Sequence, residues 1–155
     1  MRFARAFTFV EVMIVVVVIS ILAAVVIPRF GGVSQQAKAA ATESSLGGVR
    51  ASIAAYRTKQ VLAGLPPFPS VAQLTAAGTV VQGDFPINPF TGVSGVQTVT
   101  LTQAQARTVS NSAQYGWNYY VDNTATPPVA IFYANCADET DVPDGAHGYK
   151  SANKL

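Results

Sequence analysis

One uninterrupted apolar stretch near the start of the sequence constrains the fold more than any other feature. It runs from Phe7 to Ile27, FTFVEVMIVVVVISILAAVVI, and its only polar residues are Thr8, Glu11 and Ser20. At ~1.5 Å of rise per residue this stretch spans about 31 Å as a helix, which matches a hydrocarbon core of about 30 Å. Because an isolated span in lipid can satisfy its backbone only as a helix, the stretch predicts a transmembrane helix.

Glu11 is the one ionisable residue inside this stretch. An ionised side chain costs on the order of 2.5 kcal/mol or more near the bilayer centre and less near an edge. Intramembrane acids usually have partners, so Glu11 is the first candidate functional residue. The alternative is that Glu11 reaches the headgroups from its place near the helix end.

The residues before the stretch, MRFARA, carry Arg2 and Arg5 and no acid. The positive-inside bias therefore places this end in the cytoplasm and the rest of the chain outside. A short basic leader, a small residue, a Phe, an acid four residues later and a long apolar helix together resemble the class III signal of type IV pilins and pseudopilins. The run from Phe7 to Val15 is similar to that family's N-terminal signature nearly residue for residue.

The resemblance implies that the N-terminus is processed. Prepilin peptidase would cut between Ala6 and Phe7 and methylate the new amine of Phe7. The family usually has Gly before the cut, where this chain has Ala6, and both residues are small. Pro28 stands where the family commonly places a helix-bending proline, whose ring removes one helical hydrogen bond.

Processing would give Glu11 a defined partner. The cleaved Phe7 would carry a positive amine inside the apolar layer, and a neighbouring subunit displaced along a filament would bring its amine onto Glu11. Leaving one member of a buried ion pair without the other costs roughly 3–5 kcal/mol. The pair would therefore set the register of subunits during filament assembly.

The rest of the chain is more polar and predicts a helix followed by a small domain. Four apolar residues repeat on one helical face: Leu46, Val49, Ile53 and Tyr56. Gly64 with the prolines after it ends the helix. The predicted segments are a leader over residues 1–6, a transmembrane and assembly helix over 7–28, an extracytoplasmic continuation of the helix over 29–63, and a globular loop-plus-sheet domain with an acidic tail over 64–155.

The globular part predicts one short helix and three strands. Ser70 is suited to cap a helix over residues 71–77. The strand candidates are Val96–Leu101, Tyr115–Val121 and Val129–Tyr133, which together suggest an antiparallel meander. The predicted fold class is α+β and pilin-like: a long N-terminal helix, membrane-spanning in its first half, packed on a small antiparallel β-sheet.

The loop before the first strand contains the run Asn88–Gly92, NPFTG, which is a dense turn signature. It is similar to an element between helix and sheet in many pseudopilin-like domains. By itself the motif is weak. We expect a surface turn that Phe85 and Phe90 hold in place.

The C-terminal tail contains half of the acids in the chain: Asp138, Glu139, Asp141 and Asp144. Major pseudopilins commonly bind calcium in a C-terminal loop, and hard cations prefer such oxygen ligands. The resemblance thus implies a calcium site at Asp138, Asp141 and Asp144. Their spacing matches no strict calcium motif, so the sequence favours a solvated acidic tail, with calcium binding as the second interpretation.

Neither the composition nor the motifs of the sequence indicate a nucleic-acid-binding protein or an enzyme. No basic patch indicates nucleic-acid binding, and no phosphate-binding glycine loop, paired metal motif or nucleophile elbow indicates an enzyme. The chain has a single cysteine, Cys136, so it cannot form an intrachain disulfide. We expect Cys136 to be a buried or neutral thiol, with intermolecular pairing as the alternative. Many type IV pilins carry a C-terminal disulfide loop, and its absence favours the pseudopilin branch.

The resemblance therefore implies a structural subunit of a type II secretion-like filament, assembled through its N-terminal helix to drive protein export. The implied partners are further copies of itself, other pseudopilins, prepilin peptidase, and an assembly ATPase with its inner-membrane platform. The chain would cross the inner membrane once, with its globular domain in the periplasm.

Three alternatives stay open. The first is a type IV pilin subunit for adhesion, motility or DNA uptake. The second is a single-pass anchored binding domain that does not polymerise. The third is a soluble secreted domain, released if the apolar stretch is an ordinary signal peptide cut near residues 37–39.

Overall fold

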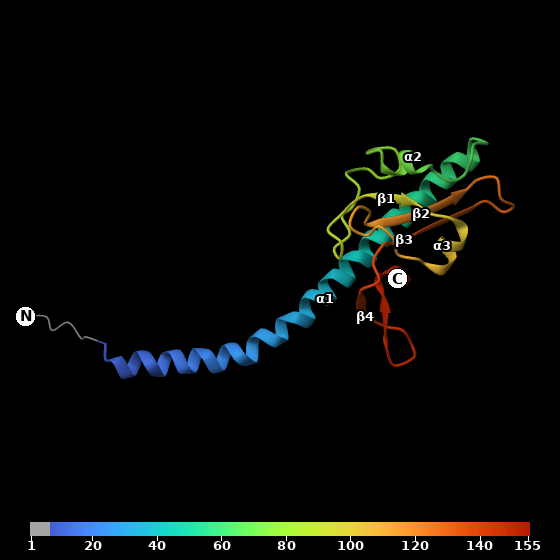
Figure 1. Ribbon diagram of the computed structural model, residues 1–155. Coiled ribbons are helices and arrows are strands. Elements are labelled where there is room, and N and C mark those ends of the chain that lie inside the picture. The colour runs from blue at the N-terminus through green and yellow to red at the C-terminus, as the bar shows by residue number, and fades with distance from the viewer. Residues whose placement is uncertain (1–6) are drawn as a thin grey trace, which may run out of the picture. The chain divides into compact units, whose positions relative to one another are not determined.

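The structure is a computed structural model that describes residues 7–155, without the side chains of residues 27–32. Its contacts divide the chain into two units, Met1–Gln35 and Gln36–Leu155. The longest element, helix α1 (Phe9–Leu62), contributes residues to both units (Figure 1). Each unit is described separately below.

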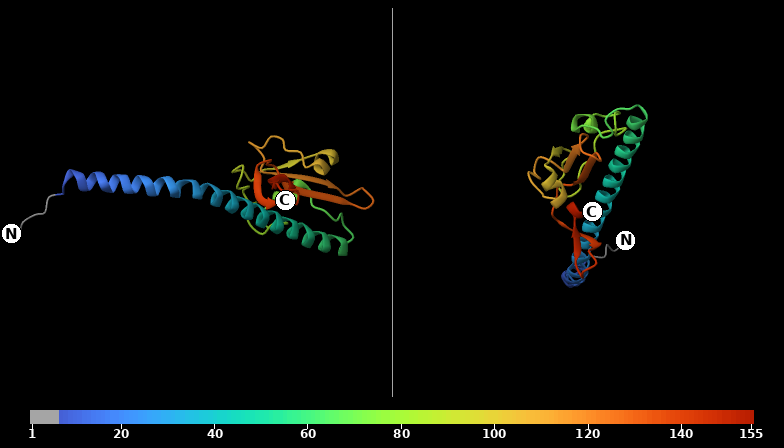
Figure 2. Two further views of the ribbon diagram at one scale, coloured as in Figure 1. Left: turned by 90° about the horizontal axis from the view of Figure 1, so that it is seen from below. Right: turned by 90° about the vertical axis from the view of Figure 1, so that its right-hand side faces the viewer.

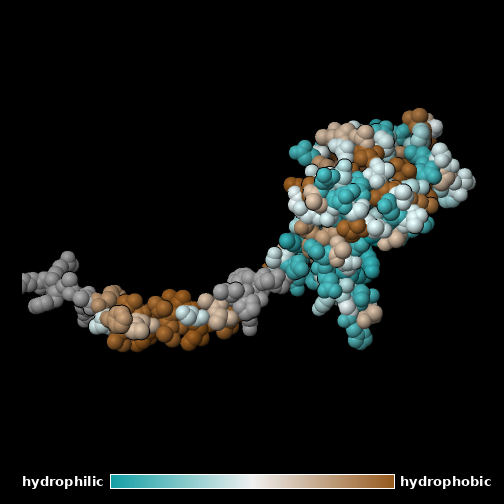
Figure 3. Space-filling view, in the orientation of Figure 1, coloured by the Kyte–Doolittle hydropathy of each residue, from teal (hydrophilic) through white to brown (hydrophobic). Residues whose placement is uncertain are grey.

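The described part of the N-terminal unit is helical and exposes an apolar surface on all sides. Within the described residues, one window, Phe9–Val26, is long and apolar enough to cross a membrane by length and composition, and none of it is buried. Figure 3 shows the visible face of this stretch as mostly apolar. A helix that is apolar all round is stable only where lipid or other protein surrounds it.

In the globular unit, α1 packs one face on a small sheet (Figure 2). Leu46, Val49 and Ile53 are buried and Tyr56 is partly buried, which confirms the predicted apolar stripe. The helix ends at Leu62, just before Gly64, whose φ of +69° is a left-handed conformation that glycine adopts without strain.

The main sheet is mixed. Strand β1 (Val96–Thr98) pairs in parallel with β2 (Trp117–Asp122), and β2 pairs antiparallel with β3 (Val129–Ala134). The expected antiparallel meander is therefore wrong at its first pairing. The chain crosses over between β1 and β2 through helix α3 (Leu101–Ala106), and a crossover returns a strand parallel to its predecessor.

Helix α3 also shortens the first predicted strand. Thr100 and Gln103 form a capping box, in which each side chain accepts a hydrogen bond from the other residue's backbone N–H. This box starts a helix at Leu101, which the sequence pattern had assigned to the strand. The other short helix, α2 (Val71–Thr75), begins after Ser70 as predicted, through a capping box with Gln73.

The acidic tail is ordered as a second sheet of two strands. Strand β4 (Glu139–Pro143) pairs antiparallel with β5 (Tyr149–Ser151), and a short 3-10 helix, η1 (Ala152–Lys154), follows. Hereafter the segment 138–151 is called the acidic hairpin. Figure 1 shows it projecting from the globular unit, and in Figure 3 the projection is hydrophilic.

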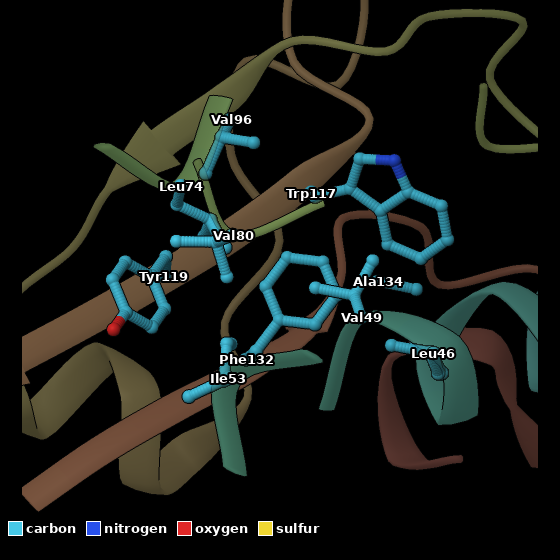
Figure 4. Close-up of a cluster of buried hydrophobic side chains, with 10 residues drawn as sticks. All are labelled: Leu46, Val49, Ile53, Leu74, Val80, Val96, Trp117, Tyr119, Phe132 and Ala134. Atoms are coloured by element: carbon cyan, nitrogen blue, oxygen red, sulfur yellow. The ribbon is translucent and has the colours of Figure 1, made fainter. Parts of the chain in front are cut away.

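The core lies between α1 and the main sheet (Figure 4). Trp117 and Phe132 stack with ring centroids 5.4 Å apart, and Tyr119 meets Phe132 edge-on at 6.4 Å. Leu46, Val49 and Ile53 of α1 pack against this aromatic group. The fold is thus α+β and pilin-like: a long helix whose first part is apolar and whose second part packs on a small sheet.

Asn88 is the anchor of the loop that precedes β1. Its side chain is fully buried, donates to the carbonyl of Gly116 at 2.7 Å, and accepts from the N–H of Phe90 at 2.9 Å. Phe85 does pack edge-on against Phe132, with centroids 6.0 Å apart. The expected surface turn is therefore tied to the sheet by a buried amide, in addition to aromatic packing.

Candidate functional site

The start of α1 brings Thr8 and Glu11 into a reciprocal set of hydrogen bonds. The Thr8 backbone N–H and its hydroxyl both donate to Oε2 of Glu11 at 2.9 Å. The Glu11 backbone N–H donates to the Thr8 hydroxyl at 3.2 Å. This arrangement is a capping box, which satisfies N–H groups that the first turn of a helix leaves without partners.

The capping box gives Glu11 a local role that the sequence analysis missed, although Thr8 and Glu11 stand at the diagnostic spacing of three residues. Both bonds from Thr8 end on one carboxylate oxygen, Oε2. The other oxygen, Oε1, accepts no hydrogen bond from any residue that the structure describes. Glu11 is exposed, so this second oxygen is available to a donor from another molecule.

Of the other residues predicted to take part in processing or to bend the helix, the structure describes Phe7 in full but not Ala6 or the side chain of Pro28. Phe7 is 83% exposed, next to the capping residue Thr8. Ala6 lies outside the described residues. The side chain of Pro28 is likewise outside the description, so the predicted helix kink there stays a prediction.

The aspartates of the acidic hairpin, all within the described residues, do not form a cluster that could hold a metal ion. Oδ1 of Asp144 accepts from the N–H groups of Ala146 and Gly148 at 2.7 and 2.9 Å, and these bonds hold the pKa of Asp144 below its usual value. Across residues 7–155, omitting the undescribed side chains, no group of three or more His, Cys, Asp or Glu is placed to hold a metal ion. The calcium site of Asp138, Asp141 and Asp144 stays a prediction from the sequence.

Cys136 follows β3 and is buried. Burial raises the pKa of its thiol to about 11, so the thiol is neutral near pH 7. This environment agrees with the expected buried, neutral thiol.

The exposed apolar helix begins with the Thr8–Glu11 capping box and continues into a small α+β domain, which is consistent with a pilin-like fold. A family model described as the prokaryotic N-terminal methylation motif matches residues 1–27. The N-terminal segment therefore carries a type IV pilin-like class III signal. Searches of curated proteins and of solved structures gave no match.

The matched segment covers the apolar helix and none of the globular unit. The motif is that of a structural class of protein, and it supports a subunit that polymerises after processing by prepilin peptidase. One apolar helix near the N-terminus fits the membrane anchor of such a protein.

Proposed function

We propose that this chain is a pseudopilin, the structural subunit of a type II secretion-like filament that drives protein export. The observation that carries the proposal is the methylation motif on an apolar helix whose one acid keeps a carboxylate oxygen without a partner among the described residues. That combination offers both a surface and a charge to a neighbouring subunit.

The apolar surface provides the reason to assemble. In the membrane, lipid covers the side chains of Phe9–Val26, which are exposed in the subunit. A filament that leaves the membrane loses this cover, and apolar surface exposed to water costs about 25 cal/mol per Å². The helices of neighbouring subunits would then replace the lipid.

The charge of Glu11 would set how neighbouring subunits align along the filament. Cleavage between Ala6 and Phe7 would create an amine at Phe7, and methylation would keep it positive. A neighbour's amine would bind Oε1 of Glu11, while Oε2 continues to cap α1 through Thr8. A misplaced subunit would leave a charge unpaired in an apolar surrounding, which costs roughly 3–5 kcal/mol.

The pseudopilin assignment is supported by the single cysteine, because a C-terminal disulfide loop would need two. As a pseudopilin, the subunit would cross the inner membrane once, with residues 29–63 continuing the helix and 64–155 forming the globular domain in the periplasm. Its partners would be other pseudopilins, prepilin peptidase, an assembly ATPase and the inner-membrane platform.

The test separates the two roles of Glu11. Glu11→Gln removes the charge but keeps a side chain that completes a capping box. Thr8→Ala keeps the charge and removes the cap, which costs about 1 kcal/mol of helix stability. We expect cells producing Glu11→Gln to form no filaments, and cells producing Thr8→Ala to form them.

Filaments are measured by shearing, pelleting and electron microscopy, with membrane levels of each variant as the control. Normal filaments from Glu11→Gln would contradict the proposed register. Deleting the chain should stop export of folded proteins across the outer membrane. If export continues and long surface fibres or DNA uptake are lost instead, the subunit is a type IV pilin.

A further inference from the structure

Three arginines line one open pocket of the globular unit. The pocket has a volume of about 430 Å³ and lies between α1 and β3. Arg50 and Arg57 lie on α1, and Arg107 is the C-cap residue directly after α3. Phe68 and Phe132 contribute apolar walls, and no acidic side chain belongs to the lining.

The three guanidinium groups contact carbonyl oxygens and aromatic rings. Arg50 donates to the carbonyl of Phe132 at 3.0 Å and to the backbone oxygen of Leu155, the last residue of the sequence, at 3.1 Å. Arg107 donates to the carbonyl of Asn153 at 3.3 Å. Arg57 lies 5.2 Å from the ring centroid of Phe68.

No acidic side chain balances these charges. Among the described residues, no Lys or Arg side chain lies within 4.0 Å of an Asp or Glu side-chain oxygen. Arg50 is exposed overall, but partial desolvation of its guanidinium, together with the nearby positive charge of Arg107, lowers the pKa of Arg50. The pocket is therefore a place where an anion would relieve repulsion between neighbouring cations.

The acidic hairpin carries the complementary charge. Along β4, Thr140 is buried while Glu139 and Asp141 are exposed, so these two acids lie on one face of the strand, about 7 Å apart. Arg50 and Arg57 lie two turns apart on α1, about 10 Å along the axis. Arginine forks bind carboxylates bidentately, and two carboxylates on one strand face suit this spacing.

The charge balance favours a second copy over a foreign anion. The unit Gln36–Leu155 contains equal numbers of basic and acidic residues, so it has no net charge to attract a polyanion such as nucleic acid. Three of its seven basic residues line the pocket, and four of its seven acids lie on the hairpin. Lys150 and Lys154 are the basic residues nearest these acids in the sequence; the charge of Lys154 helps to lower the pKa of Asp144, and neither lysine forms an ion pair among the described residues.

We propose that the acidic hairpin of one copy docks, through Glu139 and Asp141, in the arginine pocket of the next copy. This inference rests on the proposed filament and adds a contact between its globular units. The two surfaces differ, so the contact is heterologous, and within the proposed filament it would repeat from copy to copy along an open helical array.

The test reverses charges in the full-length chain. Arg57 and Asp141 donate or accept no side-chain hydrogen bond among the described residues, which makes their replacement compatible with folding. We expect Arg57→Glu and Asp141→Arg each to reduce filament yield by about tenfold or more, because like charges then face each other. The double variant restores the attraction and should restore filaments.

Matched controls make the same charge changes elsewhere. Lys59→Glu and Glu43→Arg alter exposed residues of α1 outside the pocket and should leave the yield unchanged. Thermal unfolding of each purified variant in detergent checks the fold. Failure of the double variant to recover, with wild-type filaments present and folding intact, would overturn the inference.

A second readout reports the contact directly. Cysteines placed beside the charges, Ala54→Cys in the pocket with Val142→Cys next to Asp141, leave both charges in place. This double variant should give a ladder of multimers with a short bismaleimide, whereas each single variant should stay at dimers or below. Filaments of the double variant without a ladder would overturn the docking alone. If wild-type cells form no filaments at all, the proposed function fails, and the docking falls with it.

Discussion

The side-chain amide of Asn88 donates a 2.7 Å hydrogen bond to the backbone carbonyl of Gly116, 28 residues further along the chain. The bond joins the loop before β1 to the residue that precedes β2. Asn88 is fully buried, and its Oδ1 also accepts from the N–H of Phe90. One side chain therefore fixes the loop's own turn and attaches it to the sheet.

Replacing Asn88 by Ala should destabilise the globular unit by about 1–3 kcal/mol, because the carbonyl of Gly116 and the N–H of Phe90 would both lose their buried partner. Urea unfolding of the full chain in detergent, followed by Trp117 fluorescence, measures the change. Gln105→Ala, at an exposed position of α3, is the control and should change little. An Asn88→Ala midpoint equal to wild type would show that the bond adds no stability.

Gly116 should tolerate no larger residue. A Cβ there would lie 2.0 Å from the carbonyl oxygen of Val93 and 2.9 Å from the Cβ of Asn88. We expect Gly116→Ala to cost about 3 kcal/mol, at the upper end of the overpacking range. Gly83→Ala, where nothing lies within 4 Å, should be close to neutral in the same unfolding assay, and equal effects from the two would argue against this close approach.

Leu46 should be a major contact between helix and sheet. It is 1% exposed and packs in the core with Trp117 and Phe132. Leu46→Ala should cost about 2–5 kcal/mol through lost burial and the cavity left behind. Val61→Ala, on the same helix but 57% exposed, should stay within about 0.5 kcal/mol, and the difference in thermal midpoint between the two variants tests the packing.

The thiol of Cys136 should be unreactive in the native protein. With a pKa of about 11, about one thiol in a thousand is ionised at pH 8, against roughly a quarter at an ordinary pKa near 8.5. Because the native pKa lies above the unfolded one, stability should fall as the pH rises above about 8.5. Maleimide labelling at pH 8 should be slow until the chain is denatured. Ala137→Cys in a Cys136→Ser background places a thiol at an exposed position and should react quickly, and equal rates would contradict the burial.

The mature chain should begin at a methylated Phe7. Mass spectrometry of the N-terminal peptide from membranes measures this directly. A start at Met1 would indicate a plain membrane anchor, and a start near Ala40 a secreted soluble domain. Either result would remove the amine that Glu11 is proposed to bind.

Local patterns in the sequence were enough to predict much of the helix and the core. The repeat of Leu46, Val49 and Ile53 identified the buried face of α1, because side chains at that spacing share one side of a helix. The position of Gly64 identified the helix end. The capping boxes at Thr8 and Thr100 were also readable from local spacing, and overlooking the second one turned the start of α3 into strand.

The remaining features depend on contacts between distant residues. The parallel pairing of β1 with β2 follows from the crossover through α3, and the composition of a three-residue strand does not encode its direction. The burial of Asn88 depends on the carbonyl of Gly116, a backbone group that any residue would supply. The arginine pocket joins residues from α1 and from the end of α3, which no sequence interval brings together.

Thr8 binds only one carboxylate oxygen of Glu11, and this affects how fast and how accurately one subunit would bind the next. A free glutamate loses up to about 2 kcal/mol of rotamer entropy when a partner immobilises it. In this chain the two bonds from Thr8 already hold the carboxylate at the helix start. An arriving amine would therefore meet an acceptor that is fixed in direction, and the subunit would recognise its neighbour with a preorganised group.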